Sequence, residues 1–364
     1  MKHPIIAATA TALGVTAATA TLAETTLAYG SWAPSSDPAS KAFDTFSEAV
    51  ADTAAVRFDT FYDGSVVGMR TVLGGIEDGL VDVGYVAGAI YQAEMPIDSM
   101  LTQFSVVEAN PLSISAAVTD FILNDCDDCR AEAQGHGVLP LAYAGTPHFY
   151  LMCKDPIASF DDLKGESIRA ASANLRFVNF IGATPVNTPT TEVMEAIQRG
   201  QVECAVGSIF WLQAYSLWDS VGYVLDLPMG QYNNGLVFGV NEEIWNDDLD
   251  DDARAAILGN LPTLVTQAAA NGIVAADAIR AESIERGVVW GEPTDEMRAT
   301  MAEWFASERA SVQKWGEDHG VTNAATILDG FVAKVAHWNA RVGELNGDAD
   351  AVRAELAETV YAGR

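Results

Sequence analysis

The sequence is poor in basic residues. Its 364 residues include 20 Lys and Arg against 50 Asp and Glu, which gives a formal net charge of −30 at pH 7. Nucleic-acid phosphates need Lys and Arg to neutralise them, so we expect no nucleic acid as a partner. Apolar residues still make up 49% of the chain, unlike acidic chains that stay disordered. The composition therefore indicates a folded protein with a strongly acidic surface.

The sequence also lacks the motifs of common catalytic and cofactor sites. It has no phosphate-binding Gly loop, no nucleophile elbow and no zinc-type pair of histidines. The acidic stretch 246–252 lacks the central Gly of a calcium loop. We therefore expect no catalytic residue, metal or cofactor. The histidines beyond residue 23 are scattered and are expected to be structural: His136, His148, His319 and His337.

The first residues have the pattern of a cleaved export signal. Lys2 provides a basic start, and the apolar run from Ile5 to Ala23 ends in a small-x-Ala sequence. The run is too short and too diluted by Thr and Gly to favour the alternative, a membrane anchor. We expect cleavage near Ala23 and a periplasmic protein. No later stretch is apolar for long enough to cross a bilayer.

A helix–Gly–strand unit occurs twice in the chain. Residues 76–82, Ile-Glu-Asp-Gly-Leu-Val-Asp, are echoed 121 residues later by residues 197–203, Ile-Gln-Arg-Gly-Gln-Val-Glu. Each unit predicts the end of an amphipathic helix, a Gly cap and a strand. Strands that alternate with helices are typical of parallel α/β sheets, and the spacing is the length of a domain. We therefore expect two similar α/β lobes with a cleft between them.

The four cysteines suggest structural disulfides. Cys126 and Cys129 have the spacing of redox sites, but two acids lie between them and they follow a helical stretch. In the oxidising compartment of an exported protein, a structural disulfide between them is the favoured interpretation. Cys153 and Cys204 lie on expected strands. They either pair with each other or stay buried as small apolar residues.

Spaced motifs in residues 160–203 resemble the solute-binding subunits of TRAP transporters, the DctP-type receptors of a proton- or sodium-driven pair of membrane subunits. The resemblance covers residues 26–286. It is specific because several spaced motifs follow one another along the chain in the same order as in the family. Beyond residue 294 only the helical character matches. The motifs are Phe160-Asp-Asp-Leu-Lys-Gly-Glu-Ser-Ile-Arg169, Gly182-Ala-Thr-Pro185, Thr191-Glu-Val193 and Ala196-Ile-Gln198-x-Gly200-x-Val202-Glu203, preceded by Tyr62-Asp-Gly-Ser-Val-Val-Gly68, Gly79-Leu-Val-Asp82-Val-Gly84 and Tyr91 to Met95-Pro96.

The resemblance implies a two-lobed α/β fold of the periplasmic-binding-protein type, with a long helix that crosses both lobes. We expect lobe I in residues 24–145 and about 236–275. Lobe II is expected in residues 146–235 and about 276–364, including the C-terminal helices. The cleft is expected to close on a small carboxylate, which the receptor delivers to the small and large membrane subunits.

Arg169 stands where the family has its ligand-binding arginine, on the strand after the Asp-Leu-Lys-Gly turn. A guanidinium is always charged, and its planar fork matches both oxygens of a carboxylate. Apolar neighbours, Ile168 and Ala170, also set this arginine apart from an ordinary surface charge. Where many members carry a second arginine before the turn, this chain has Lys154, a less directional cation.

Other departures from the family indicate a less polar pocket. Trp32, Met69 and Ala87 align with polar positions of the sialic-acid-binding member, and Ser208 lies where sugar-acid-binding members place an Asn. Unsatisfied buried polar groups cost about 1–3 kcal/mol each. We therefore expect a smaller, apolar or aromatic carboxylate. The residues expected to offer ring faces, with ordinary packing as the alternative for each, are Trp32, Phe149, Tyr150, Phe210 and Trp211.

Two other functions would use the same architecture. An exported enzyme would need a nucleophile–base pair or a reactive thiol in the cleft, and the sequence shows neither in a suitable context. A binding protein for an ABC importer shares the two-lobed plan. The Arg169 motif and the expected crossing helix argue against it. The sequence is compatible with a monomer or a homodimer.

Overall fold

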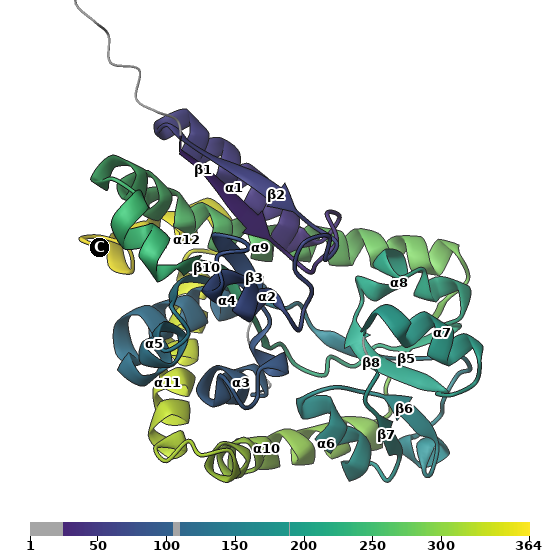
Figure 1. Ribbon diagram of the computed structural model, residues 1–364. Coiled ribbons are helices and arrows are strands. Elements are labelled where there is room, and N and C mark those ends of the chain that lie inside the picture. The colour runs from purple at the N-terminus through teal and green to yellow at the C-terminus, as the bar shows by residue number, and fades with distance from the viewer. Residues whose placement is uncertain (1–24, 105–109, 189) are drawn as a thin grey trace, which may run out of the picture.

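Two lobes, each built on its own β-sheet, lie side by side, and helices join them along opposite sides of the molecule (Figure 1). This computed structural model describes residues 25–104, 110–188 and 190–364. The expected signal peptide, residues 1–23, lies outside the described residues. The expected two-lobed α/β fold is confirmed.

Lobe I contains a five-stranded sheet in the order β2-β1-β3-β10-β4. The first three strands are parallel, and β10 runs antiparallel to both β3 and β4. Helix α1 buries Phe43, Phe46 and Val50 on the face that its sequence spacing predicts. The elements are β1 (Thr25–Gly30), α1 (Pro38–Thr53), β2 (Val56–Phe61), α2 (Val72–Glu77), β3 (Val83–Val86), α3 (Pro96–Thr102), α4 (Pro111–Asp120), α5 (Asp127–Gln134), β4 (Val138–Gly145) and β10 (Asn233–Asn241).

Lobe II contains a six-stranded sheet in the order β11-β9-β5-β8-β6-β7. Here β6, β7 and β8 are parallel, and β5 runs antiparallel to both β8 and β9. From β7 to β9 the order therefore repeats that of lobe I from β2 to β4. The elements are β5 (Phe149–Cys153), β6 (Ser167–Arg169), α6 (Ala173–Phe180), β7 (Thr184–Val186), α7 (Val193–Gln198), β8 (Cys204–Ser208), α8 (Trp211–Ala214), β9 (Tyr223–Leu225) and β11 (Val289–Gly291).

The repeated helix–Gly–strand unit lies at equivalent places in the two lobes. Gly79 ends α2 with φ of 69°, and Gly200 ends α7 with φ of 65°. Both values fall in the left-handed region that glycine adopts without a steric penalty. The backbone N–H of Leu80 and that of Gln201 each donate back into the preceding helix, over 2.8 and 2.9 Å. Strands β3 and β8, which follow, occupy the middle of their sheets.

Two long helices carry the chain across both lobes. Helix α9 (Asp251–Glu285) packs Leu261 and Val265 into the core of lobe I, and Ile279 into that of lobe II. Helix α10 (Asp295–Asp318) lies on the opposite side and buries Trp304 in lobe II and Val312 in lobe I (Figure 1). With the two strand connections, β4 to β5 and β9 to β10, these helices tie the lobes together.

A polar contact also joins the lobes beside α10. Arg176, on α6 of lobe II, donates to the side-chain oxygen of Gln103 in lobe I over 2.9 Å. The same guanidinium donates to both carboxylate oxygens of Glu308 on α10, over 3.0 and 2.7 Å. Glu308 is 1% exposed, so this pair supplies the partner that a buried carboxylate requires.

The C-terminal helices pack on lobe I, which corrects their expected assignment to lobe II. Helices α11 (Ala324–Glu344) and α12 (Ala349–Thr359) contribute Phe331 and Leu356 to the core of lobe I. Trp338 donates from its indole nitrogen to Asp120 over 2.9 Å, and the Tyr361 hydroxyl donates to the carbonyl of Leu141 over 2.7 Å. An amphipathic pattern shows that a helix buries one face, but not which lobe covers that face.

All four cysteines form disulfides. Cys126 pairs with Cys129 at the start of α5, which confirms the favoured interpretation. Cys153 and Cys204 lie directly opposite each other on β5 and β8 and also pair. Within the described part of the chain, no helix is both long and apolar enough to span a membrane.

Candidate ligand-binding site

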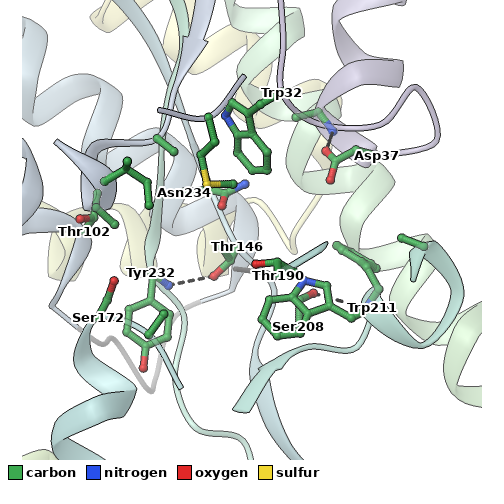
Figure 2. Close-up of a pocket in the computed structure, with 18 of the residues that line it drawn as sticks. Trp32, Asp37, Thr102, Thr146, Ser172, Thr190, Ser208, Trp211, Tyr232 and Asn234 are labelled. Atoms are coloured by element: carbon green, nitrogen blue, oxygen red, sulfur yellow. Dashed lines mark hydrogen bonds between the residues drawn. The ribbon is translucent and has the colours of Figure 1, made fainter. Parts of the chain in front are cut away.

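A cavity of about 530 Å³ lies between the lobes and is shown in Figure 2. It lies at the carboxyl ends of parallel strands, where ligands of open α/β sheets gather. Trp32 and Ala87 follow β1 and β3, while Arg169 and Ser208 end β6 and β8. Eight of the ten residues expected at the site line this cavity: Trp32, Met69, Ala87, Phe149, Arg169, Ser208, Phe210 and Trp211.

Arg169 is held rigidly in the lobe II wall of the cavity. Its Nε donates to the carbonyl of Thr188 over 2.9 Å, and one Nη donates to the carbonyl of Val206 over 3.3 Å. The other Nη donates to the Thr190 hydroxyl over 3.3 Å. These bonds use one N–H of each terminal nitrogen, so each retains a second N–H that can donate to a carboxylate.

The charge of Arg169 has no anionic partner in the described part of the chain. The side chain is 4% exposed, and burial lowers the pKa of the guanidinium to about 10. It therefore stays protonated at neutral pH. No carboxylate of the described residues lies within 4.0 Å of it. A buried cation held only by neutral groups is electrostatically prepared for an anion.

Trp211 covers one face of this guanidinium. The Arg169 Cζ atom lies 4.7 Å from the centroid of the indole ring, which is within cation–π range. The ring can approach strand β8 because residue 207 is a glycine. A Cβ atom on Gly207 would lie only 1.9 Å from the Trp211 ring.

Aromatic rings form much of the remaining cavity wall. The Phe149 ring lies 5.0 Å from that of Tyr232 and 6.1 Å from that of Trp211, measured between centroids. Across the cavity, Trp32 packs on Tyr85 at 4.9 Å. Aromatic surfaces bury apolar area with little loss of side-chain entropy. A flat or compact apolar ligand body would find ring contacts in both lobes.

The structure does not place Lys154 and Tyr150 at the cavity, which corrects the expectation for both. Strand β5 begins at the cavity with Phe149 and leads away from it, so Lys154 lies roughly 16 Å farther along. Its Nζ is 3.9 Å from the carboxylate of Glu203. Tyr150 points to the other face of the sheet, because side chains alternate, and packs on Trp290 with 5.3 Å between centroids.

Several polar cavity residues escaped the sequence analysis. Asp37 was overlooked because an Asp before Pro38 reads as a helix N-cap, a role that it also fills by accepting from the Ala39 N–H over 2.8 Å. The Tyr232 hydroxyl donates to Asn174 over 3.2 Å. Ligand sites in α/β proteins lie at the carboxyl ends of parallel strands, and this rule could have indicated such residues from the sequence. The polar residues missed in this way are Asp37, Asp63, Arg70, Thr102, Thr146, Ser172, Asn174, Asn187, Thr188, Thr190, Tyr215, Tyr232, Asn233 and Asn234.

The fold and the interlobe cavity together define a two-lobed solute-binding protein. Residues 29–314 match the sequence profile of the family described as bacterial extracellular solute-binding protein, family 7, the DctP family. The chain belongs to this family, and solved structures that share its fold are TRAP solute-binding proteins.

Solved structures with the same fold come from several sources. A TRAP solute-binding protein from Rhodoferax ferrireducens, in complex with copurified benzoate, is 16% identical with a TM-score of 0.76 over 87% of this chain and 99% of that chain. A marine metagenome protein specific for aromatic acids, in complex with metahydroxyphenylacetate, is 18% identical with a TM-score of 0.75 over 87% and 100%. A Bordetella pertussis receptor that binds pyroglutamic acid is 16% identical with a TM-score of 0.71 over 84% and 99%.

Proposed function

We propose that this protein is the solute receptor of a TRAP-type transporter, which captures a small carboxylate with an apolar or aromatic body and delivers it to the small and large membrane subunits. The observation that carries the proposal is Arg169. It is a buried cation in the interlobe cavity with two N–H groups to spare and no anionic partner among the described residues.

The cavity walls support the choice of ligand class. A volume of about 530 Å³ falls in the range of ordinary small-molecule sites. Rings from both lobes, among them Trp32, Phe149 and Trp211, can enclose an apolar body. Related receptors of this fold hold benzoate, metahydroxyphenylacetate or pyroglutamate. Each of these ligands is a compact monocarboxylate.

The periplasm is the proposed location. The start of the chain has the pattern of an export signal, and the family is extracellular. Two disulfides fit an oxidising compartment, where they form and persist.

A ligand screen followed by calorimetry on Arg169 variants tests the proposal. We expect benzoate, phenylacetate or related monocarboxylates to raise the melting temperature more than uronic or sialic acids, because ligand binding stabilises only the folded state. Arg169→Ala should weaken the best ligand about 30-fold to several-thousand-fold, since the loss of one partner of a buried charge pair costs about 2–5 kcal/mol. Arg169→Lys should recover only part, because an ammonium lacks the planar fork.

Arg199→Ala is the matched control. Arg199 is an exposed lobe II arginine paired with Glu195 outside the cavity, so its loss should leave affinity unchanged. Near-wild-type affinity in a folded Arg169→Ala protein, or a screen in which only sugar acids bind, would overturn the proposal.

A further inference from the structure

Asp37 brings a carboxylate into the same cavity from lobe I. It lies in the loop between β1 and α1, half-buried in the cavity lining. Its backbone N–H donates to the carbonyl of Pro34 over 2.9 Å, and Pro38 begins the helix behind it. Figure 2 shows its side chain across the cavity from Trp211 of lobe II. These contacts fix the backbone of Asp37, and its side chain lines the cavity.

This carboxylate has no cationic partner in contact. It accepts capping hydrogen bonds from the backbone N–H groups of Ala39 and Ser40, and no Lys or Arg of the described ranges lies within 4.0 Å of it. Lys41, one turn along α1, acts on it from a longer distance. Burial outweighs the capping bonds and Lys41, and raises the pKa of Asp37 to about 6. At neutral pH the group is an anion that would gain from a hydrogen-bond donor.

Tyr215 also lines the cavity. Burial raises the pKa of this phenol, the negative charge of Asp37 raises it further, and the positive charge of Arg169 lowers it. The phenol thus lies within electrostatic range of both groups. The other charged residues of the lining, Asp63 and Arg70, are exposed, and the charge of Asp63 also raises the pKa of Tyr215, as the last of its causes.

We propose that Asp37 recognises the end of the ligand remote from its carboxylate, so that the preferred ligands carry a hydroxyl or ammonium donor there and dicarboxylates are rejected. This inference rests on the proposed carboxylate site at Arg169. A ligand without a donor leaves Asp37 desolvated and unsatisfied when the cavity is filled. A second carboxylate adds repulsion between like charges in a medium of low polarity.

Ligands that differ in one group test the proposal. The probes are benzoate, its meta- and para-hydroxy and aminomethyl derivatives, and the two corresponding benzenedicarboxylates, titrated by calorimetry. We expect the wild-type protein to prefer at least one donor-bearing derivative over benzoate by about tenfold to a hundredfold, the usual effect of a hydrogen bond to a charged group. Neither dicarboxylate should bind measurably.

Asp37→Asn is the informative variant. Asn is as good an N-cap as Asp, so helix α1 should keep its start and the melting temperature of the free protein should change little. We expect the preference for the aminomethyl derivative to shrink to less than about threefold and dicarboxylate binding to appear. Asp250→Asn is the control, since Asp250 is an exposed aspartate that caps helix α9 in the same way, by accepting from the Ala253 N–H over 2.8 Å, but lies outside the cavity. It should keep the wild-type ratios.

The outcomes separate this proposal from the proposed function. If benzoate binds and needs Arg169 but no donor-bearing derivative binds more tightly, the role of Asp37 is overturned and the carboxylate site stands. Retention of the wild-type ratios in Asp37→Asn has the same meaning. If no probe binds, or if Arg169→Ala binds them all as wild type does, both proposals fail.

Discussion

The two lobes have the same strand order but differ at the strand end that meets the cavity. In lobe I, Gly30 ends β1 and pairs with Gly84 on β3. In lobe II, Arg169 ends β6 and pairs with Ala205 on β8. The 121-residue offset of the repeat relates positions 84 and 205, so Gly30 and Arg169 are equivalent positions.

Packing explains why only one lobe has a side chain at this position. A Cβ atom on Gly30 would lie 2.4 Å from a methyl carbon of Val67 and 2.9 Å from one of Val81. Lobe I therefore fills this strand end with its own chain, whereas lobe II leaves room for a guanidinium that faces the cavity. The comparison teaches that a repeated backbone can provide a rigid wall in one lobe and an anion-binding group in the other.

A second difference lies deeper in the sheets. The cross-strand pair Val83 and Val240 joins β3 to β10 in lobe I. At the equivalent place in lobe II, Cys204 and Cys153 join β8 to β5 and form a disulfide. Both pairs lie in antiparallel ladders, but only the disulfide adds a covalent link, and that link closes a long loop.

The largest effect on stability should come from replacing the Cys153–Cys204 disulfide by a pair of valines like that in lobe I. The double variant Cys153→Val, Cys204→Val opens a loop with a sequence separation of 51. The chain-entropy model gives a loss of about 4 kcal/mol in the free energy of unfolding, which urea titration would measure. Removal of the Cys126–Cys129 bridge, with a separation of 3, should cost about half as much. Equal losses from the two removals would contradict loop length as the cause.

A smaller effect is expected from a side chain at the glycine position of lobe I. Gly30→Ala should lower the free energy of unfolding by about 1–3 kcal/mol, because Val67 and Val81 must move to admit the methyl group. Gly259→Ala is the control, since the position is exposed on α9 and a Cβ there meets nothing within 4 Å. It should be neutral or stabilising. A stable Gly30→Ala protein would mean that packing does not explain the asymmetry.

The most gradual effect should be a pH dependence of the free energy of unfolding, caused by a buried carboxylate in lobe I. Asp98 is 2% exposed, and a hydrogen bond from the Asn233 side chain only partly offsets the burial of its charge. Burial, and secondarily the charge of Glu132, raise its pKa from 3.8 to about 8. Between these values the folded chain keeps a proton that the unfolded chain releases. The free energy of unfolding should therefore fall by about 1.4 kcal/mol for each pH unit as the pH rises.

Asp98→Asn should flatten this part of the pH profile. Urea unfolding at about pH 6.5 and 8, above the pKa of about 6 of Asp37, would measure the difference in slope. Lobe II offers the contrast, because its buried Arg169 is held by hydrogen bonds and stays charged throughout this range. Parallel profiles for the variant and the wild-type protein would refute the assignment to Asp98.

Local patterns in the sequence were enough to predict the repeated units and the two lobes. Gly79 and Gly200 mark helix ends through their own conformational freedom, which requires no tertiary information. Arg169 was found by its resemblance to the family and by its place on an apolar strand. Asp37 was not found, because a helix cap accounts for it locally and its second role depends on the other lobe. Lys154 was misplaced because it lies at the far end of β5.

Lobe I is formed by chain segments that precede and follow lobe II in the sequence. This arrangement affects the order in which the two lobes can fold during synthesis. The buried core of lobe II is drawn from residues 151–304, whereas that of lobe I extends from Leu27 to Tyr361. During synthesis from the N-terminus, the last core residue of lobe II is therefore made before the last core residue of lobe I, although lobe I begins first. Until β10 and α11 are made, β3 lacks one neighbouring strand and α4 lacks the helix that packs on it. We expect lobe II, which holds Arg169, to complete its core before lobe I does.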